Sequence, residues 1–180
     1  MSKAPEHVEL LVANARRGKP EALAKIYAQH KDVLYRVALG LMRSWADAED
    51  VVQEVLVGLP EALRRYRGDG PLEGWLVRVT TRTALMELRR RRRRRRRESL
   101  LVDWGWIKRR SGVRDEVDRI SLDRALAALP ETQRAAFLLK EVEGYSHDEI
   151  AEMLGITTGA SRARFFRAAR NLRSQLAGDT

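Results

Sequence analysis

Two helical segments that meet at a glycine, in the last third of the chain, constrain the fold more than any other feature of the sequence. Ser146, followed three residues later by Glu149, forms a capping box, in which each side chain accepts a hydrogen bond from the backbone at a helix start. Gly155 supplies the left-handed backbone conformation that commonly ends a helix. Between them, one apolar face is formed by Ile150, Ala151 and Leu154. The pattern predicts two helices joined by a tight corner.

The helix after this corner is predicted to be amphipathic and strongly basic. Ile156 fills the corner, and Thr157 can cap the new helix. Arginines recur along one side (Arg162, Arg164, Arg167, Arg170 and Arg173) and apolar residues along another (Phe165, Ala168, Ala169, Leu172 and Leu176). Such a pair is typical of a helix-turn-helix, whose second helix lies in the DNA major groove. The alternative is a helical hairpin in an ordinary core, with solvated arginines.

The charge of the chain favours a polyanionic partner. The 180 residues include 35 lysines and arginines against 25 aspartates and glutamates, for a formal net charge of +10. A surface of this kind usually binds nucleic acid. Cysteine is absent and the three histidines (His7, His30 and His147) are far apart, so we expect no disulfide, metal or cofactor. No cluster of nucleophile, base or metal ligands points to an enzyme.

The sequence contains no segment typical of membrane insertion or export. A run of about 18 apolar residues is absent, so no membrane insertion is expected. The amino terminus lacks a basic and then apolar leader, from which we expect a cytoplasmic protein.

The spacing of apolar residues predicts an all-α fold of two small helical domains. Almost every apolar pattern repeats at about 3.6 residues rather than at two. We expect one domain over residues 6–97 and another over 116–177, joined by a basic, flexible linker over 98–115. Helices are predicted after Pro20, from Val51 to Leu59 with an end near Pro60, from Trp75 to Leu88, from Ile120 to Leu129, and from Ala135 to Val142.

Nine consecutive arginines occupy residues 89–97, and a block of like charge repels itself. One interpretation is a flexible segment or solvated helix end with no role in reading sequence. Another is contact with DNA phosphates, which releases counterions and strengthens binding at low salt. The sequence leaves both interpretations open.

One segment of the first domain is acidic, unlike the rest of the chain. Asp47, Glu49 and Asp50 are predicted to lie in a first helical turn, where carboxylates stabilise the helix dipole. Asp50, Gln53 and Glu54 share one face, with valines opposite. Such a stripe is unsuited to DNA and fits a basic protein partner. By spacing alone, an ordinary solvated helix start is the simpler interpretation.

Residues 66–72 are predicted to form a loop, because they include two glycines and a proline. The helix after the loop holds Trp75 together with Arg78, Arg82 and Arg89. Rings and guanidinium groups together suit single-stranded DNA, because bases stack on rings while arginines hold phosphates. Trp75 itself is better explained as a core residue, which leaves the loop and the arginines for DNA.

Together these segments resemble the group IV, or extracytoplasmic-function (ECF), sigma factors of bacterial RNA polymerase, in the sigma-70 family. Residues 47–55 resemble the helix with which that family docks on polymerase. Residues 66–69 and 75–79 resemble its reader of the promoter −10 element. Residues 129–131, 143–151, 155–156 and 162–168 resemble its reader of the −35 element. The segments cover nearly the whole chain in the family's order.

The resemblance implies a non-enzymatic specificity subunit with a region 2-like and a region 4-like domain. It would bind core polymerase, recognise the −35 and −10 elements and promote melting. The implied polymerase-binding residues are Asp47, Asp50, Gln53 and Glu54. The implied −10 residues are Arg67, Gly68, Asp69, Arg78, Arg82 and Arg89, and the implied −35 residues are Arg162, Ala163, Arg164, Phe166 and Arg167.

The implied partners are bacterial core RNA polymerase, through its β′ clamp helices and β flap, promoter DNA, and an anti-sigma factor. The alternative is a stand-alone helix-turn-helix regulator with a sensing or dimerising front domain, which has no need of the acidic stripe. Ser161 puts a hydroxyl where the family usually has an aliphatic residue, so we expect looser packing at the start of the basic helix.

Overall fold

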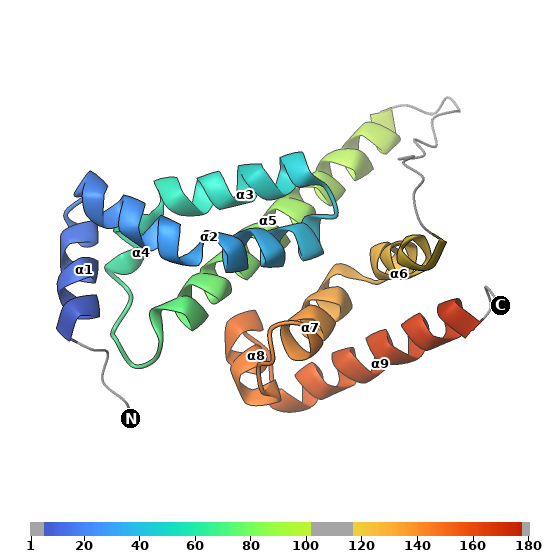
Figure 1. Cartoon of the computed structure of the whole chain (residues 1–180). Coiled ribbons are helices and arrows are strands. Elements are labelled where there is room, and N and C mark those ends of the chain that lie inside the picture. Colours follow the sequence, from blue (N-terminus) through green and yellow to red (C-terminus); the bar gives the residue numbers. More distant parts are fainter. Residues whose placement is uncertain (1–5, 102–116, 178–180) are drawn as a thin grey trace. The chain divides into compact units, whose positions relative to one another are not determined.

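The computed structural model describes residues 6–101 and 117–177 and, within them, the side chains of residues 8–94 and 122–176. All regular structure in the described residues is helical, which confirms the predicted fold class (Figure 1). Two compact units are present, and the first ends at Ala84, inside α5. The predicted domain boundaries stay a prediction, because most of the predicted linker lies outside the described residues. No helix in the described ranges is long and apolar enough to cross a membrane.

The first unit contains α1 (Glu6–Arg16), α2 (Pro20–Met42), α3 (Trp45–Val57), α4 (Leu59–Leu63) and the first part of α5 (Leu72–Leu101). Helices α2 and α3 lie side by side, and α1 packs against α2 and α4 (Figure 1). The core is made of aliphatic side chains that are almost fully buried, among them Ile26, Leu34, Leu41, Val51, Val52, Leu59, Leu63 and Leu76. The sequence analysis did not predict α1.

Helix α3 ends at Val57, close to the predicted end near Pro60, but Leu59 and Pro60 belong to the next helix. Pro60 lies in the first turn of α4, where the missing proline N–H has no intrahelical partner to lose. The predicted first turn of α3 is wrong in one detail. Because Ser44 caps α3, only Asp47 of the acidic residues lies in its first turn, and Glu49 and Asp50 follow in the second.

Helix α5 continues without interruption through the nine arginines to Leu101. The backbone of residues 89–97 is therefore helical, as in the solvated-helix interpretation, and the helix extends four residues into the predicted linker. Arginine is a good helix former, and Glu87 lies 2.8 Å from Arg91 and 3.9 Å from Arg90. These contacts offset part of the repulsion at the beginning of the run.

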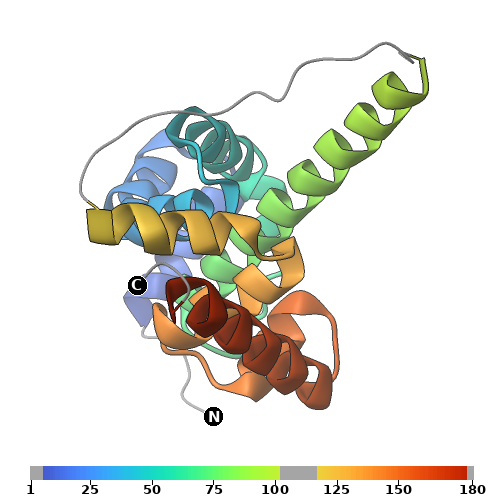
Figure 2. The ribbon, with the colours of Figure 1, turned by 90° about the vertical axis from the view of Figure 1, so that its right-hand side faces the viewer.

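The second unit contains α6 (Val117–Ala128), α7 (Glu131–Glu141), α8 (His147–Leu154) and α9 (Thr158–Ala177). Helix α9 packs against the other three helices, and α8 meets it near its start (Figures 1 and 2). The shared core consists of Ala125, Leu126, Leu129, Ala168 and Leu172, with Phe137 packed against it.

Arg134 connects α7 to the end of α6 from inside this unit. Its side chain is buried, and Nη1 donates hydrogen bonds to the carbonyls of Leu126, Ala127 and Leu129 at 3.3, 3.4 and 3.4 Å. A cation at the carboxyl end of a helix satisfies carbonyls that have no partner within the helix. The position of α6 therefore depends on this charge.

We expect Arg134→Met to weaken the second unit by about 2 kcal/mol, the usual value for hydrogen bonds to a charged group. Amide hydrogen exchange of α6 and α7 in the full chain would measure the loss, while α2 and α3 keep their protection. Arg124→Met, at an exposed position of α6, is the control and should change little. Equal effects of the two variants would contradict the role given to Arg134.

Candidate nucleic-acid and protein interfaces

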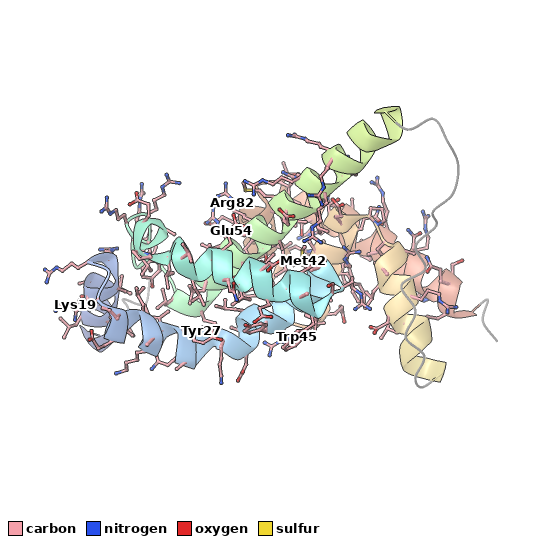
Figure 3. All side chains as sticks on the ribbon, turned by 90° about the horizontal axis from the view of Figure 1, so that it is seen from above. Lys19, Tyr27, Met42, Trp45, Glu54 and Arg82 are labelled. Carbon is pink, nitrogen blue, oxygen red and sulfur yellow. The ribbon has the colours of Figure 1, made fainter. Side chains whose placement is uncertain are left out.

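Helix α3 has a buried apolar side and an exposed acidic one. Ala48, Val51, Val52 and Val55 are buried. Asp50, Gln53 and Glu54, called the acidic face below, are all exposed, whereas Asp47 is half-buried near the helix start. Figure 3 shows Glu54 on this helix. The structure thus brings the predicted residues together on one helix, with Asp47 less accessible than the other three.

Exposed residues that the sequence analysis did not select border the acidic face. Glu49 is exposed and lies one turn before Gln53, a spacing that could have identified it. Val57, at the end of the helix, is 84% exposed and lies on the same side of α3 as Asp50 and Glu54. Trp45, at the helix start, is 62% exposed but lies on the side of α3 away from Glu54, toward α2 (Figure 3). The Trp45 ring stacks on Tyr35 with centroids 5.4 Å apart and planes 13° apart. Apolar groups beside carboxylates suit a protein interface better than a purely solvated helix does.

The loop between α4 and α5 is organised around a buried tyrosine. Tyr66 is 6% exposed, and its hydroxyl donates a hydrogen bond to the carbonyl of Gly70 at 2.6 Å. Its ring contacts Trp75 at a centroid distance of 5.5 Å. Gly68 has a φ of 79°, in the left-handed region that favours glycine. Burial, followed by the charge of Asp69, raises the pKa of the Tyr66 hydroxyl, so it remains a hydrogen-bond donor at neutral pH.

The predicted −10 residues lie in this loop and on the helix that follows it. Arg67 and Asp69 are exposed, and Gly68 is half-buried. On α5, Arg82 and Arg89 are exposed and Arg78 is half-buried; their spacing puts the three on one side of the helix. Figure 3 shows Arg82 on α5. Trp75 is half-buried beside Tyr66, in agreement with a packing role.

The corner between α8 and α9 has the predicted local structure. Glu149 N–H donates to Ser146 Oγ at 3.2 Å, and Ser146 N–H donates to Glu149 Oε2 at 2.8 Å, which completes the capping box. The bond from Ser146 N–H, followed by one from the Ser146 hydroxyl to the same Oε2 at 2.8 Å, lowers the pKa of the Glu149 carboxyl. Gly155 has a φ of 64°, and Ala160 N–H donates to Thr157 Oγ1 at 3.2 Å. All three features confirm the prediction made from residue types.

Two side-chain contacts that the sequence analysis missed fix α9 against α8. His147 Nδ1 lies 3.1 Å from Ser161 Oγ, and the Thr158 hydroxyl donates to Asp148 Oδ1 at 2.6 Å. Ser161 is 0% exposed, so its hydroxyl is both buried and hydrogen-bonded. The expectation of looser packing at Ser161 is therefore wrong, because His147 provides a hydrogen-bond partner for the buried hydroxyl.

The outer side of α9 carries most of the predicted −35 residues. Arg162, Phe166 and Arg167 are exposed, whereas Ala163 and Arg164 are half-buried. Phe166 is 66% exposed and contacts the ring of Phe165, which stacks on Phe137 with centroids 6.0 Å apart. The opposite side is buried through Ser161, Ala168 and Leu172. Two guanidinium groups and an aromatic ring at one helix start can contact phosphates, base edges and thymine methyl groups.

Comparison with known families agrees with this arrangement. Sigma-70 region 2 matches residues 26–94, and Sigma-70, region 4 matches residues 119–172. The chain is 35% identical over 158 residues to the ECF RNA polymerase sigma factor SigE of Mycolicibacterium smegmatis, covering 85% of this chain and 61% of that relative. It is 30% identical over 160 residues to the ECF RNA polymerase sigma factor SigM of Mycobacterium tuberculosis, covering 89% and 79%. The chain thus spans less than two thirds of the length of SigE.

Solved structures of similar fold include two sigma-factor complexes. The sigma factor RpoE, in complex with the anti-sigma factor NepR from Bartonella quintana, has a TM-score of 0.68 at 24% identity, covering 87% of this chain and 98% of that chain. CnrH, in complex with the cytosolic domain of CnrY, has a TM-score of 0.66 at 27% identity, covering 95% and 97%.

The matches to both regions, in the same order as the two groups of helices, identify a sigma factor of the sigma-70 family. Within that family, the chain belongs to the ECF RNA polymerase sigma factors. These proteins direct transcription initiation by RNA polymerase and are not enzymes. A stand-alone regulator is accordingly not supported.

The contact between His147 and Ser161 predicts a pH-dependent stability of the second unit. Burial first, then the charges of Lys140 and Arg162, lower the pKa of the His147 imidazole. The unfolded chain therefore takes up a proton at a higher pH than the folded one, and stability falls as the pH drops below about 6.5. His147→Gln should remove this loss between about pH 7.5 and 5.5.

Urea unfolding, followed by the amide NMR signals of α8 and α9 at the two pH values, measures this effect. Glu149 has a lowered carboxyl pKa and affects stability at a more acidic pH. His30→Gln, in the first unit, is the matched control and should leave the pH dependence unchanged. If His147→Gln retains the dependence of the unmodified protein, another group is responsible.

Proposed function

We propose that this protein is a dissociable specificity subunit that binds core RNA polymerase through α3 and promoter DNA through α5 and α9. The observation that supports this proposal is the segregation of charge. Exposed carboxylates lie on α3, whereas exposed arginines line α5 and α9. In a chain with a net charge of +10, DNA repels the acidic face, which leaves a basic protein surface as its partner.

On the polymerase side, Asp50, Gln53 and Glu54 bind the β′ clamp helices, with Asp47 at the edge of the contact. Val57 adds apolar area beside the carboxylates, at the end of the helix. The second unit binds the β flap, which holds it near the −35 element. We expect the protein to act in the cytoplasm, where core polymerase meets promoter DNA.

On the upstream side of the promoter, α9 enters the major groove at the −35 element. Arg162, Arg164 and Arg167 contact phosphates or base edges, while Ala163 allows close approach of the backbone to the groove. Phe166 supplies an apolar surface for thymine methyl groups. The hydrogen bonds from α8 to α9 hold these side chains in one orientation.

At the −10 element, the loop captures a base that has left the DNA stack. Arg67, Gly68 and Asp69 surround the base, and Arg78, Arg82 and Arg89 hold the strand that follows. Unstacking costs a few kcal/mol per step, and binding of the exposed strand offsets it. The exposed arginines at the start of the 89–97 run add phosphate contacts that weaken with salt.

An anti-sigma factor is a further proposed partner. The structurally similar RpoE was solved with the anti-sigma factor NepR, and its fold covers most of this chain. A partner that covers the acidic face would exclude core polymerase, which gives such a protein a direct way to inhibit initiation.

The polymerase contact is tested by reversing charge on the acidic face. We expect Asp50→Arg with Glu54→Arg to weaken core binding at least about tenfold for each carboxylate, because each loses an ion pair and gains repulsion. Promoter-directed run-off transcription should fall with core binding. Affinity of purified protein for core polymerase, measured by fluorescence anisotropy, is the direct readout.

The matched control for this test reverses two exposed carboxylates elsewhere, with Asp32→Arg and Glu141→Arg. The net charge then changes equally, and core affinity should remain close to that of the unmodified protein. Equal losses in both double variants would mean that the total charge, rather than the acidic face, governs binding. Unchanged affinity after reversal of Asp50 and Glu54 would overturn the proposed docking surface.

The groove contact is tested at Arg167. We expect Arg167→Ala to weaken binding to the −35 element by about 1–3 kcal/mol and to relax the base preference at one position. Competition binding of holoenzyme to promoters that vary at each −35 position measures both effects. Arg173→Ala, further along the same helix, should weaken all sequences alike. A uniform loss for Arg167→Ala would identify it as a phosphate contact only.

A further inference from the structure

The last residue of α1 contacts the beginning of the loop that we assign to the −10 element. Arg16 Nε donates a hydrogen bond to the carbonyl of Leu63 at 2.9 Å, and Arg16 Nη2 donates to the carbonyl of Tyr66. These contacts join residues 47 and 50 positions apart in the chain. Helix α1 also precedes the matched region 2, which begins at residue 26.

The position of Arg16 is fixed by the packing of α1. Val12 and Ala15 are 3% and 0% exposed, and α1 packs against α2 and α4. Helix α4 ends at Leu63, and Tyr66 N–H donates to the Leu63 carbonyl at 3.1 Å. The guanidinium therefore lies where the helix dipole favours a cation, and its two nitrogens bridge the end of α4 and the first residue of the loop.

The same loop is also held internally and at its far end. The Tyr66 hydroxyl bonds to the Gly70 carbonyl within the loop, and His30 of α2 lies 3.4 Å from Glu73 at the start of α5. Arg67 and Asp69, between these fixed points, are exposed. A loop that is ordered before it binds loses less conformational entropy when it captures a ligand.

We propose that Arg16 is a positioning residue for −10 recognition, which holds the 66–71 loop in the conformation that captures an unstacked base. It acts through the carbonyls of Leu63 and Tyr66 and does not touch DNA. This inference rests on the proposed function of the loop. Arg17, the neighbouring residue, has the same charge and is also exposed, but in the described part of the chain it makes no hydrogen bond to the loop.

The test uses full-length protein with core polymerase and a promoter selected by run-off transcription with the unmodified protein. Permanganate reactivity of unpaired thymines measures melting at the −10 element. We expect Arg16→Ala to reduce melting about tenfold, the lower range for loss of charge-assisted hydrogen bonds. Core affinity and binding to a −35 duplex should stay within about twofold, because neither surface involves the loop.

Two further variants separate positioning from charge. Arg17→Ala removes the same charge one residue away and should melt the promoter normally. Arg16→Lys keeps the charge but lacks the planar fork that reaches two carbonyls, so it should restore little melting. Tyr66→Phe removes the hydrogen bond to Gly70 and should reproduce the melting defect, which keeps the proposal testable should Arg16→Ala fold poorly. Amides of residues 64–70 should exchange faster in Arg16→Ala and in Tyr66→Phe.

Several outcomes would overturn the inference. Normal melting by both Arg16→Ala and Tyr66→Phe would show that loop order is not needed. Full rescue by Arg16→Lys, or an equal defect in Arg17→Ala, would assign the effect to charge near DNA. A parallel loss of core affinity would assign it to general structural damage. Failure of the unmodified protein to bind core polymerase, or to start transcription from any promoter in the run-off selection, would instead refute the proposed function itself.

Discussion

The proposed binding surfaces on α3, α5 and α9 are the outer sides of helices whose inner sides are buried, so the packing of the inner sides determines where the charges lie. The valines of α3 direct its carboxylates outward, and Ser161, Ala168 and Leu172 do the same for the arginines of α9. Rotation of either helix by one residue, about 100°, would bury charge without a partner, which costs several kcal/mol. The apolar pattern therefore specifies the binding surfaces as strictly as it specifies the core.

Polar contacts between helices fix the helix rotations that the apolar core alone does not define. The core of the second unit contains alanines at Ala125 and Ala168, which allow close approach but define rotation poorly. The contacts from His147 to Ser161 and from Asp148 to Thr158 supply directional constraints near the start of α9. Arg134 supplies another at the end of α6. Directional bonds thus lie next to the segment that needs a defined orientation toward DNA.

Features set by neighbours within about four residues could be predicted from the sequence, and features set by distant residues could not. The capping box, the glycine corner and the helical period follow local rules, and the structure confirms them. Pro60 is compatible with either end of a helix, so its assignment needed the tertiary structure. The hydrogen bonds of Arg16 have no local signal in the sequence, because the accepting carbonyls lie 47 and 50 residues away. The contact between His147 and Ser161 joins residues 14 positions apart and likewise has none.

Because α5 is one continuous helix, the number of residues along it fixes the distance and the angle between its side chains. Its 30 residues correspond to a rod of about 45 Å, which begins at the proposed base-capturing loop and includes the whole arginine run. Inserting or deleting one residue between Arg82 and Arg89 would shift the guanidinium groups of residues 89–94 by about 1.5 Å along the helix and rotate them by about 100° around its axis. Evolutionary change along this rod should therefore proceed by substitution, or by length changes that restore a whole number of helical turns.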